Sequence, residues 1–161
     1  MATAMRTPTG DRDLNIQNNS TSGARFEAVA VGDALPDLQV TPTLQNAVMY
    51  AAAMWEFQKI HFDHEWSRTR EHLDGAIIQG PVLGNYLARA LGRWAGPRGR
   101  IKRLAWRNHG TAPLGEALVC SGRVTARHEN GLVDCELAIT NPRAEKIVSA
   151  TASVQLAREQ V

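Results

Sequence analysis

The sequence predicts an α+β domain in which two helices precede an antiparallel sheet. Apolar residues recur at helical spacing over residues 44–55 and again over 82–94, and from residue 101 onward they alternate as in strands. Short links rich in turn formers join the four predicted strands, so neighbouring strands must run antiparallel. A chain of 161 residues, 43% apolar and 21% charged, suits one domain with its own core.

The N-terminal segment differs from the rest in composition. Residues 1–25 are rich in Thr, Asn, Ser and Gly and poor in large apolar side chains, which predicts a mobile tail before a single domain of residues 26–161. The segment lacks the apolar core of a secretory signal, and no apolar run approaches membrane-spanning length. We therefore expect a cytoplasmic protein without membrane contact.

The domain is predicted to begin with a short apolar strand over residues 26–33 and a second short strand over 38–40. Thr43 is then a suitable N-cap for the first helix. Its apolar stripe predicts a helix packed on the core, and consists of Leu44, Ala47, Val48, Ala51 and Trp55, widened by Ala52 and Met54. Residues 57–71 are polar and irregular, with one helical turn expected near residues 64–70, and such a segment is where function tends to lie.

The second helix is predicted to begin at Pro81, because the missing N–H of proline would be unpaired there in any case. Its apolar stripe is wide enough for a largely buried helix, and consists of Val82, Leu83, Tyr86, Leu87, Ala90, Leu91 and Trp94. Gly84 and Ala88 would allow another backbone to come close. Gly96-Pro97 is expected to end the helix.

The strands are predicted over residues 101–108, 116–128, 132–141 and 146–156. If Asn130-Gly131 forms the hairpin turn, opposite residues sum to 261, so Cys120 would face Asn141 and Cys135 would face Ala126. The two cysteines would then not be cross-strand partners, and a disulfide requires close Cβ atoms. We expect free thiols in a reducing compartment.

The candidate chemistry lies just after the first helix, where Glu56, His61 and Asp63 fall within eight positions. A carboxylate five residues before an imidazole cannot share a helix face with it. A helix end that unwinds into a loop lets both side chains turn toward one cleft, where they could move protons to and from water. Alternatively, His61 only caps the helix or bonds a carbonyl, and Glu56 is only solvated. Asp63 is either the substitute carboxylate or a partner for the imidazole or a loop N–H.

The same segment resembles the hydratase motif of MaoC-like, (R)-specific enoyl-CoA hydratases and dehydratases, Asp-x-Asn-Pro-x-His. Glu56 stands at the position of the family's Asp, and His61 at that of its His. Gln58 and Lys59 stand at the positions of the Asn and Pro. The segment Gln79-Gly80-Pro81-Val82-Leu83 resembles the family's His-Gly-x-Leu, with glutamine in place of histidine. The likeness covers roughly residues 26–156.

This resemblance implies the hotdog fold, in which a curved antiparallel sheet wraps around a central buried helix. It also implies a hydro-lyase that adds water reversibly to a 2-enoyl-CoA to give a 3-hydroxyacyl-CoA. His61 and Glu56 would be the acid/base pair. Gly80 would be the oxyanion donor, since a residue without Cβ lets the carbonyl approach a helix N-terminus. The residues expected to contact substrate are Gln58, Asp63, Gln79 and Val82.

The resemblance further implies a homodimer, or a heteromer with a second MaoC-like chain. A different function is then also open, that of a non-catalytic acyl-binding subunit that completes a partner's site. A hotdog acyl-CoA thioesterase, which would direct water at the thioester carbonyl, is a less favoured alternative.

Other classes of function lack support in the sequence. No histidines, cysteines and carboxylates stand at convincing metal-ligand spacing, so neither a metal nor any cofactor beyond the CoA of the substrate is expected. There is no Gly-x-Ser-x-Gly elbow, phosphate loop or dinucleotide-binding glycine pattern. The net charge of +2 is too small to predict nucleic-acid binding. The densest basic run, residues 98–107, is expected on a solvated face, where it could also attract nucleotide phosphates.

Overall fold

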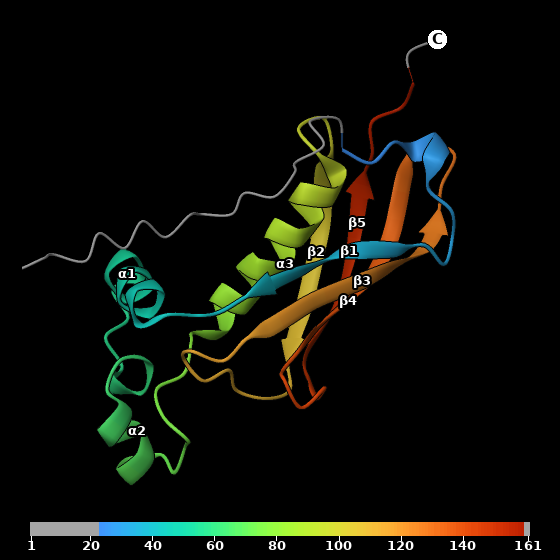
Figure 1. Cartoon of the computed structure of the whole chain (residues 1–161). Helices are drawn as coiled ribbons and strands as arrows, with labels where there is room; N and C mark the ends of the chain where they lie inside the picture. Colours follow the sequence, from blue (N-terminus) through green and yellow to red (C-terminus); the bar gives the residue numbers. More distant parts are fainter. Residues whose placement is uncertain (1–22, 160–161) are drawn as a thin grey trace, which may run out of the picture.

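The computed structural model describes residues 23–159. It contains a five-stranded antiparallel sheet in the order β1-β3-β4-β5-β2 and three α-helices (Figure 1). The strands are β1 Ala34–Val40, β2 Arg100–Asn108, β3 Leu118–Arg127, β4 Leu132–Thr140 and β5 Lys146–Gln155. The helices are α1 Leu44–Met54, α2 His64–Arg70 and α3 Gly80–Ala95, with 3-10 turns η1 Phe26–Ala28 and η2 Lys59–His61.

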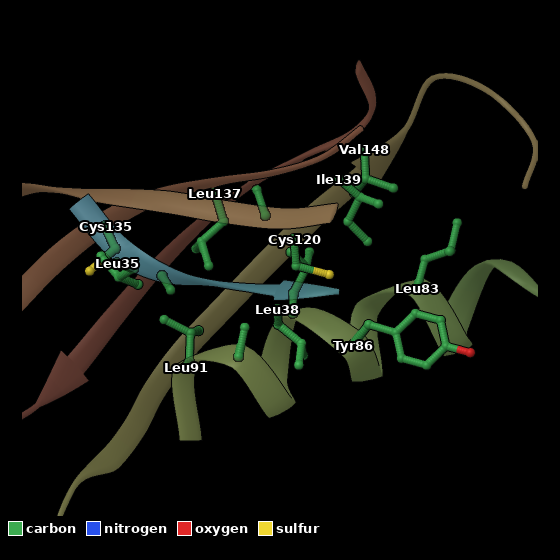
Figure 2. Packing of buried hydrophobic residues seen from close by; sticks show 14 of the residues in the cluster. Leu35, Leu38, Leu83, Tyr86, Leu91, Cys120, Cys135, Leu137, Ile139 and Val148 are labelled. Atoms are coloured by element: carbon green, nitrogen blue, oxygen red, sulfur yellow. The ribbon is translucent and has the colours of Figure 1, made fainter. Parts of the chain in front are cut away.

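The core lies between α3 and the concave face of the sheet, which curves around this helix (Figure 1). Most of the predicted α3 stripe is buried, with Leu87 and Leu91 fully enclosed and Trp94 packed against the cluster. Figure 2 shows Leu83, Tyr86 and Leu91 of this stripe beside residues of the sheet. Helix α3 begins at Gly80, one residue before the predicted start, and proline occupies its first turn. The prediction of a curved antiparallel sheet around a buried helix is confirmed.

The first strand differs from the prediction. Residues 26–28 form a 3-10 turn, and one strand, β1, runs from Ala34 to Val40 in place of strands at 26–33 and 38–40. A bulge between Leu35 and Leu38 breaks the alternation, so the buried positions are Leu35, Leu38 and Val40. Pro36 falls at this bulge in an edge strand, where a missing N–H costs no ladder bond.

Two residues of the predicted N-terminal tail make backbone contacts with the domain. The Ala24 N–H donates to the Trp94 carbonyl at 2.7 Å, and Arg25 pairs with Ala157, so these two residues contact the domain. The predicted tail over residues 1–22 lies outside the described residues.

The β3–β4 hairpin has a different register from the predicted one. Cys120 faces Ile139 and Cys135 faces Val124, because a bulge follows Val124 and the link includes residues on both sides of Asn130-Gly131. Both cysteines are buried free thiols, as expected, and burial raises the pKa of each to about 11.

Helix α1 begins as predicted but packs differently. The Thr43 side chain accepts from the Asn46 N–H, and the Asn46 side chain accepts from the Thr43 N–H, forming a capping box. Only Ala47 and Ala51 of its stripe are buried. The prediction that the stripe packs on the core is therefore wrong for its large members, which are exposed by 46% to 84%: Leu44, Val48, Met54 and Trp55.

Helices α1 and α2 lie to one side of the sheet, beyond the N-terminal end of α3 (Figure 1). Within residues 23–159, no helix has both the length and the apolar character needed to cross a membrane.

Candidate active site

The chain leaves α1 through Trp55, whose left-handed backbone (φ 56°, ψ 37°) turns it away from the helix axis. The Trp55 N–H and the Glu56 N–H both donate to the Ala51 carbonyl, the latter at 2.9 Å, which closes the end of the helix. The 3-10 turn η2 then brings His61 back toward Glu56. The Glu56 Oε1 and His61 Nε2 atoms lie 3.6 Å apart. The predicted unwinding of the helix end therefore unites the two side chains.

The orientation of His61 is set by the backbone of a distant segment. Its Nδ1 lies 2.9 Å from the Ile77 carbonyl oxygen, and the Ile77 N–H donates to the Ile60 carbonyl at 3.1 Å. A carbonyl can only accept, so Nδ1 carries a proton and, in the neutral ring, the Nε2 lone pair faces Glu56. His61 is 8% exposed, whereas the Glu56 side chain is one-third exposed. The imidazole is thus fixed at the edge of the interior, with solvent reaching the carboxylate.

Asp63 has a different role from that of Glu56. It is the N-cap of α2, and its Oδ1 accepts from the Trp66 N–H at 2.9 Å. It thus caps the first turn of α2, whereas it was expected to orient the imidazole, to bond a loop N–H or to act as the substitute carboxylate. Gln58 is exposed, and its backbone carbonyl accepts from the His61 N–H at 3.1 Å.

The N-terminus of α3 holds the other predicted residues. Gln79 is its N-cap residue, is 1% exposed, and donates from Nε2 to the Ala47 carbonyl at 3.0 Å, which ties α3 to α1. Within residues 23–159, its Oε1 has no partner although it is buried. The amide N–H of Gln79 therefore has a structural role, because it links α3 to α1. Val82 is buried in the next turn.

Gly80 is the first residue of α3, where the backbone N–H groups have no intrahelical acceptor. A Cβ at this position would lie 2.5 Å from the Asn108 Nδ2 atom. The absence of a Cβ at Gly80 was expected to let a substrate carbonyl approach. In the structure, the Asn108 amide at the end of β2 lies against the space where that Cβ would be. About one helical turn further along α3, Gly84 accommodates the Trp106 ring in place of the backbone that was expected there.

Two contacts in this site could not be predicted from the sequence. The Ile77 carbonyl orients His61, and Asn108 borders Gly80, yet each depends on long-range pairing of segments. The pairing of Ile77 with Pro113 and the Ile78 N–H bond to the Ala112 carbonyl hold the segment before α3 in place. Among the described residues, no group of three or more His, Cys, Asp or Glu could hold a metal ion.

Several solved structures are similar to this chain. The (R)-hydratase PhaJ1 from Pseudomonas aeruginosa is 17% identical, with a TM-score of 0.78 over 85% of this chain and 88% of that one. A MaoC-like dehydratase from Rhodospirillum rubrum is 21% identical, with a TM-score of 0.65 over 86% and 100%. The ChsH1–ChsH2 complex from Mycobacterium tuberculosis contains a chain that is 24% identical, with a TM-score of 0.70 over 79% and 98%. No curated protein sequence matches the chain.

The fold is therefore the hotdog fold, and its relatives are hydratases and dehydratases of the MaoC-like type. A family model described as hydroxyacyl-thioester dehydratase type 2 matches residues 9–115, about two-thirds of the chain. The chain belongs to this family of lyase-type enzymes.

Proposed function

We propose that the chain catalyses the reversible addition of water to a 2-enoyl-CoA, giving a 3-hydroxyacyl-CoA. The observation that carries this proposal is the approach of Glu56 to the buried, oriented His61, at 3.6 Å between Oε1 and Nε2. Membership of a hydroxyacyl-thioester dehydratase family supports the thioester substrate and the reaction type.

A single water can bridge the two groups. A water oxygen at about 2.8 Å from each of two atoms that are 3.6 Å apart stands at a feasible hydrogen-bond angle. As its oxygen bonds to C3 of the enoyl group, the water gives one proton to the pair, and C2 receives one proton from the pair. The π electrons of the double bond pass transiently to the thioester oxygen. The pair ends each turnover with the protons with which it began, and the reverse sequence is the dehydration.

The negative charge on the thioester oxygen needs a donor that is already in place. In this proposal the Gly80 N–H supplies it at the start of α3, where the helix dipole favours negative charge. Val82 and Gln79 would border the bound thioester from the first turn of α3, and Gln58 and Asp63 from the loop that carries His61. The proposal requires no metal and no redox cofactor.

The test follows the ultraviolet absorbance of the conjugated thioester across a panel of 2-enoyl-CoAs, using the purified full chain. His61→Ala and Glu56→Gln are each expected to lower the rate by about a hundredfold or more, because each removes one partner in proton transfer. A simultaneous assay for free CoA thiol detects thioester hydrolysis, which would indicate the thioesterase alternative.

Two matched variants control this test. His128→Ala removes a histidine on the β3–β4 hairpin that pairs with Asp134, and should leave the rate unchanged. Asp63→Asn removes the charge from the α2 cap and should affect stability more than rate. If Glu56→Gln is harmless and Asp63→Asn abolishes activity, Asp63 is the working carboxylate and the assignment of Glu56 is wrong.

The exposed large side chains of α1 favour a second candidate function, that of a subunit completed by another chain. Met54, Trp55 and Phe57 flank Glu56 and are each more than half exposed, with the Trp55 and Phe57 rings edge to face at 5.4 Å. One similar structure is itself a complex of two different chains, ChsH1 and ChsH2. A folded chain without activity on any enoyl-CoA, which gains activity on addition of a second MaoC-like chain, would favour this function.

A further inference from the structure

A groove of about 520 Å³ lies between α1, the C-terminal end of β1 and the face of α3 that starts at Val82. This volume is within the usual range for small-molecule sites. Its polar lining comes from all three elements and includes Gln39, Asn46, Tyr50, Asn85, Tyr86 and Arg89. Neither Glu56 nor His61 lines it, so it is separate from the proton-transfer pair.

Tyr86 is the most informative residue of this groove. It is only 8% exposed, and its hydroxyl points away from Leu38 and Leu91 at the margin of the core (Figure 2). Among residues 23–159 that hydroxyl makes no hydrogen bond, and its oxygen is not fully buried, so it remains accessible at the groove. Burial raises the pKa of Tyr86, an effect that Arg89 opposes, so the hydroxyl is a proton donor at neutral pH. The ring of Tyr86 is thus held in the core, while its hydroxyl is available to a ligand that enters the groove.

Arg89 supplies the charge of the groove. Its guanidinium lies 5.9 Å from the centre of the Tyr86 ring. Among residues 23–159 it forms no ion pair, although both Arg89 and Asp37 of β1 are near enough to Cys120 to influence its pKa. A guanidinium with free N–H donors beside a hydroxyl donor is suited to bind an oxyanion, because a carboxylate or phosphate can accept hydrogen bonds from both groups.

The groove also lies at a useful distance from the start of α3. Val82 is two residues beyond Gly80, and Arg89 is seven residues beyond Val82, which is about 10 Å along a helix. Arg89 is nine residues beyond Gly80, or about 13.5 Å along the helix, so a ligand with its thioester carbonyl at Gly80 would need a second functional group about that far away to reach Arg89. This link to catalysis rests on the proposed function, whereas binding in the groove does not.

We propose that this groove is an oxyanion-binding subsite, in which Tyr86 and Arg89 together hold a carboxylate or phosphate of the thioester ligand. The anion comes either from the far end of the acyl group or from the phosphates of the carrier. In both cases the recognition is the same: the hydroxyl donates one hydrogen bond and the guanidinium donates one or two.

Another hollow, of about 730 Å³ on the outer face of the sheet, lacks these features. Its Arg123 already bonds Glu136 at 3.0 Å, and its centre is lined by small side chains such as Ser121, Ala138 and Ser149. Its other cations, Arg107 and Lys146, have no tyrosine hydroxyl beside them in the lining, so this hollow lacks the combination of donors that Tyr86 and Arg89 offer.

The test is calorimetric titration of the full chain with four probes: CoA, pantetheine, suberate and octanoate. If the phosphates occupy the groove, CoA binds and pantetheine does not; if an acyl carboxylate occupies it, suberate binds more tightly than octanoate. Arg89→Gln should weaken the binding of the preferred anion about tenfold or more, and Tyr86→Phe about fivefold. Tyr86→Phe should leave the thermal unfolding temperature unchanged, since the hydroxyl has no partner to lose.

Arg93→Gln is the matched control, because Arg93 lies one turn further on α3 and outside the groove. It should leave binding unchanged. The proposal is overturned if no probe binds at about 10 mM, or if Arg89→Gln and Arg93→Gln have equal effects. Binding that persists in His61→Ala while the wild type turns over no enoyl-CoA would refute the hydratase proposal alone.

Discussion

Helices α1 and α3 have similar apolar patterns in the sequence but different surroundings in the fold. The α3 stripe is enclosed by the curved sheet, and Leu83, Leu87 and Leu91 are each at most 2% exposed. The α1 stripe is covered only at Ala47 and Ala51, while Val48 and Met54 remain about half exposed. Apolar periodicity thus predicts which face of a helix is apolar, but the topology of the chain decides what covers it.

The two helices consequently differ in what holds them. Helix α3 contacts every strand of the sheet and gains stability from the burial of its apolar side chains. Helix α1 is held by local devices, namely the capping box at Thr43 and the Gln79 bond to the Ala47 carbonyl. Substitutions in α3 should therefore act on the whole fold, and those in α1 should act locally.

The largest effect is expected from Leu87→Ala, which leaves a cavity at a fully buried position. We expect a loss of about 2–5 kcal/mol in the free energy of unfolding, measured by urea denaturation. Val48→Ala is the matched change on α1 and should cost less than about 1 kcal/mol, since that side chain is 48% exposed. Equal losses in the two variants would contradict the contrast between the helices.

The next effect tests the close contact between α3 and β2. A Cβ at Gly84 would lie 2.5 Å from the Trp106 ring, so Gly84→Ala should cost about 1–3 kcal/mol through displacement of that ring. Gly92→Ala on the same helix meets nothing within 4 Å and should be neutral or stabilising by up to about 1 kcal/mol. Thermal unfolding of the pair measures both effects, and a harmless Gly84→Ala would show that the ring moves freely.

A smaller and local effect is expected at the start of α1. Thr43→Ala removes the side chain that caps the Asn46 N–H and should destabilise α1 by about 1 kcal/mol. Hydrogen exchange of the α1 amides should then accelerate about fivefold, while the α3 amides change less. Acceleration of both helices to the same extent would mean that α1 unfolds only with the whole domain.

The smallest effect on stability is expected from Met54→Gln. The side chain is 59% exposed, so the free energy of unfolding should change by less than about 0.5 kcal/mol. If a second chain covers this surface, the same variant should raise the concentration at which the assembly dissociates. Sedimentation velocity, run beside the urea titration, separates the two results.

Much of the fold could be predicted because its signals are local. Turn residues, helix caps and alternation placed α1, α2, α3 and the four C-terminal strands within about two residues. The errors fall where a bulge changes the spacing: Leu35 and Leu38 both face the core in β1, and Cys135 pairs with Val124. A bulge is chosen by the fit of a strand to its neighbours, which the strand's own sequence does not reveal.

The site could be predicted only in part, for a related reason. The spacing of Glu56 and His61 after a helix end indicated that the two would meet, and they do. What completes the arrangement comes from remote segments, namely the Ile77 carbonyl and the Asn108 amide. The Tyr86 hydroxyl belongs to an apolar stripe in the sequence, and only the three-dimensional packing separates it from its neighbours.

The bond between His61 and the Ile77 carbonyl has a consequence for how the ring can exchange protons. The carbonyl can accept from Nδ1 both when the ring is neutral and when it is a cation, so neither state requires the imidazole to rotate. Gain and loss of a proton are confined to Nε2 and proceed without reorganisation of the ring. The Nδ1 proton should accordingly exchange slowly with solvent and give a resolved signal in nuclear magnetic resonance, at a pH where the protons of the exposed imidazoles exchange too rapidly to be seen.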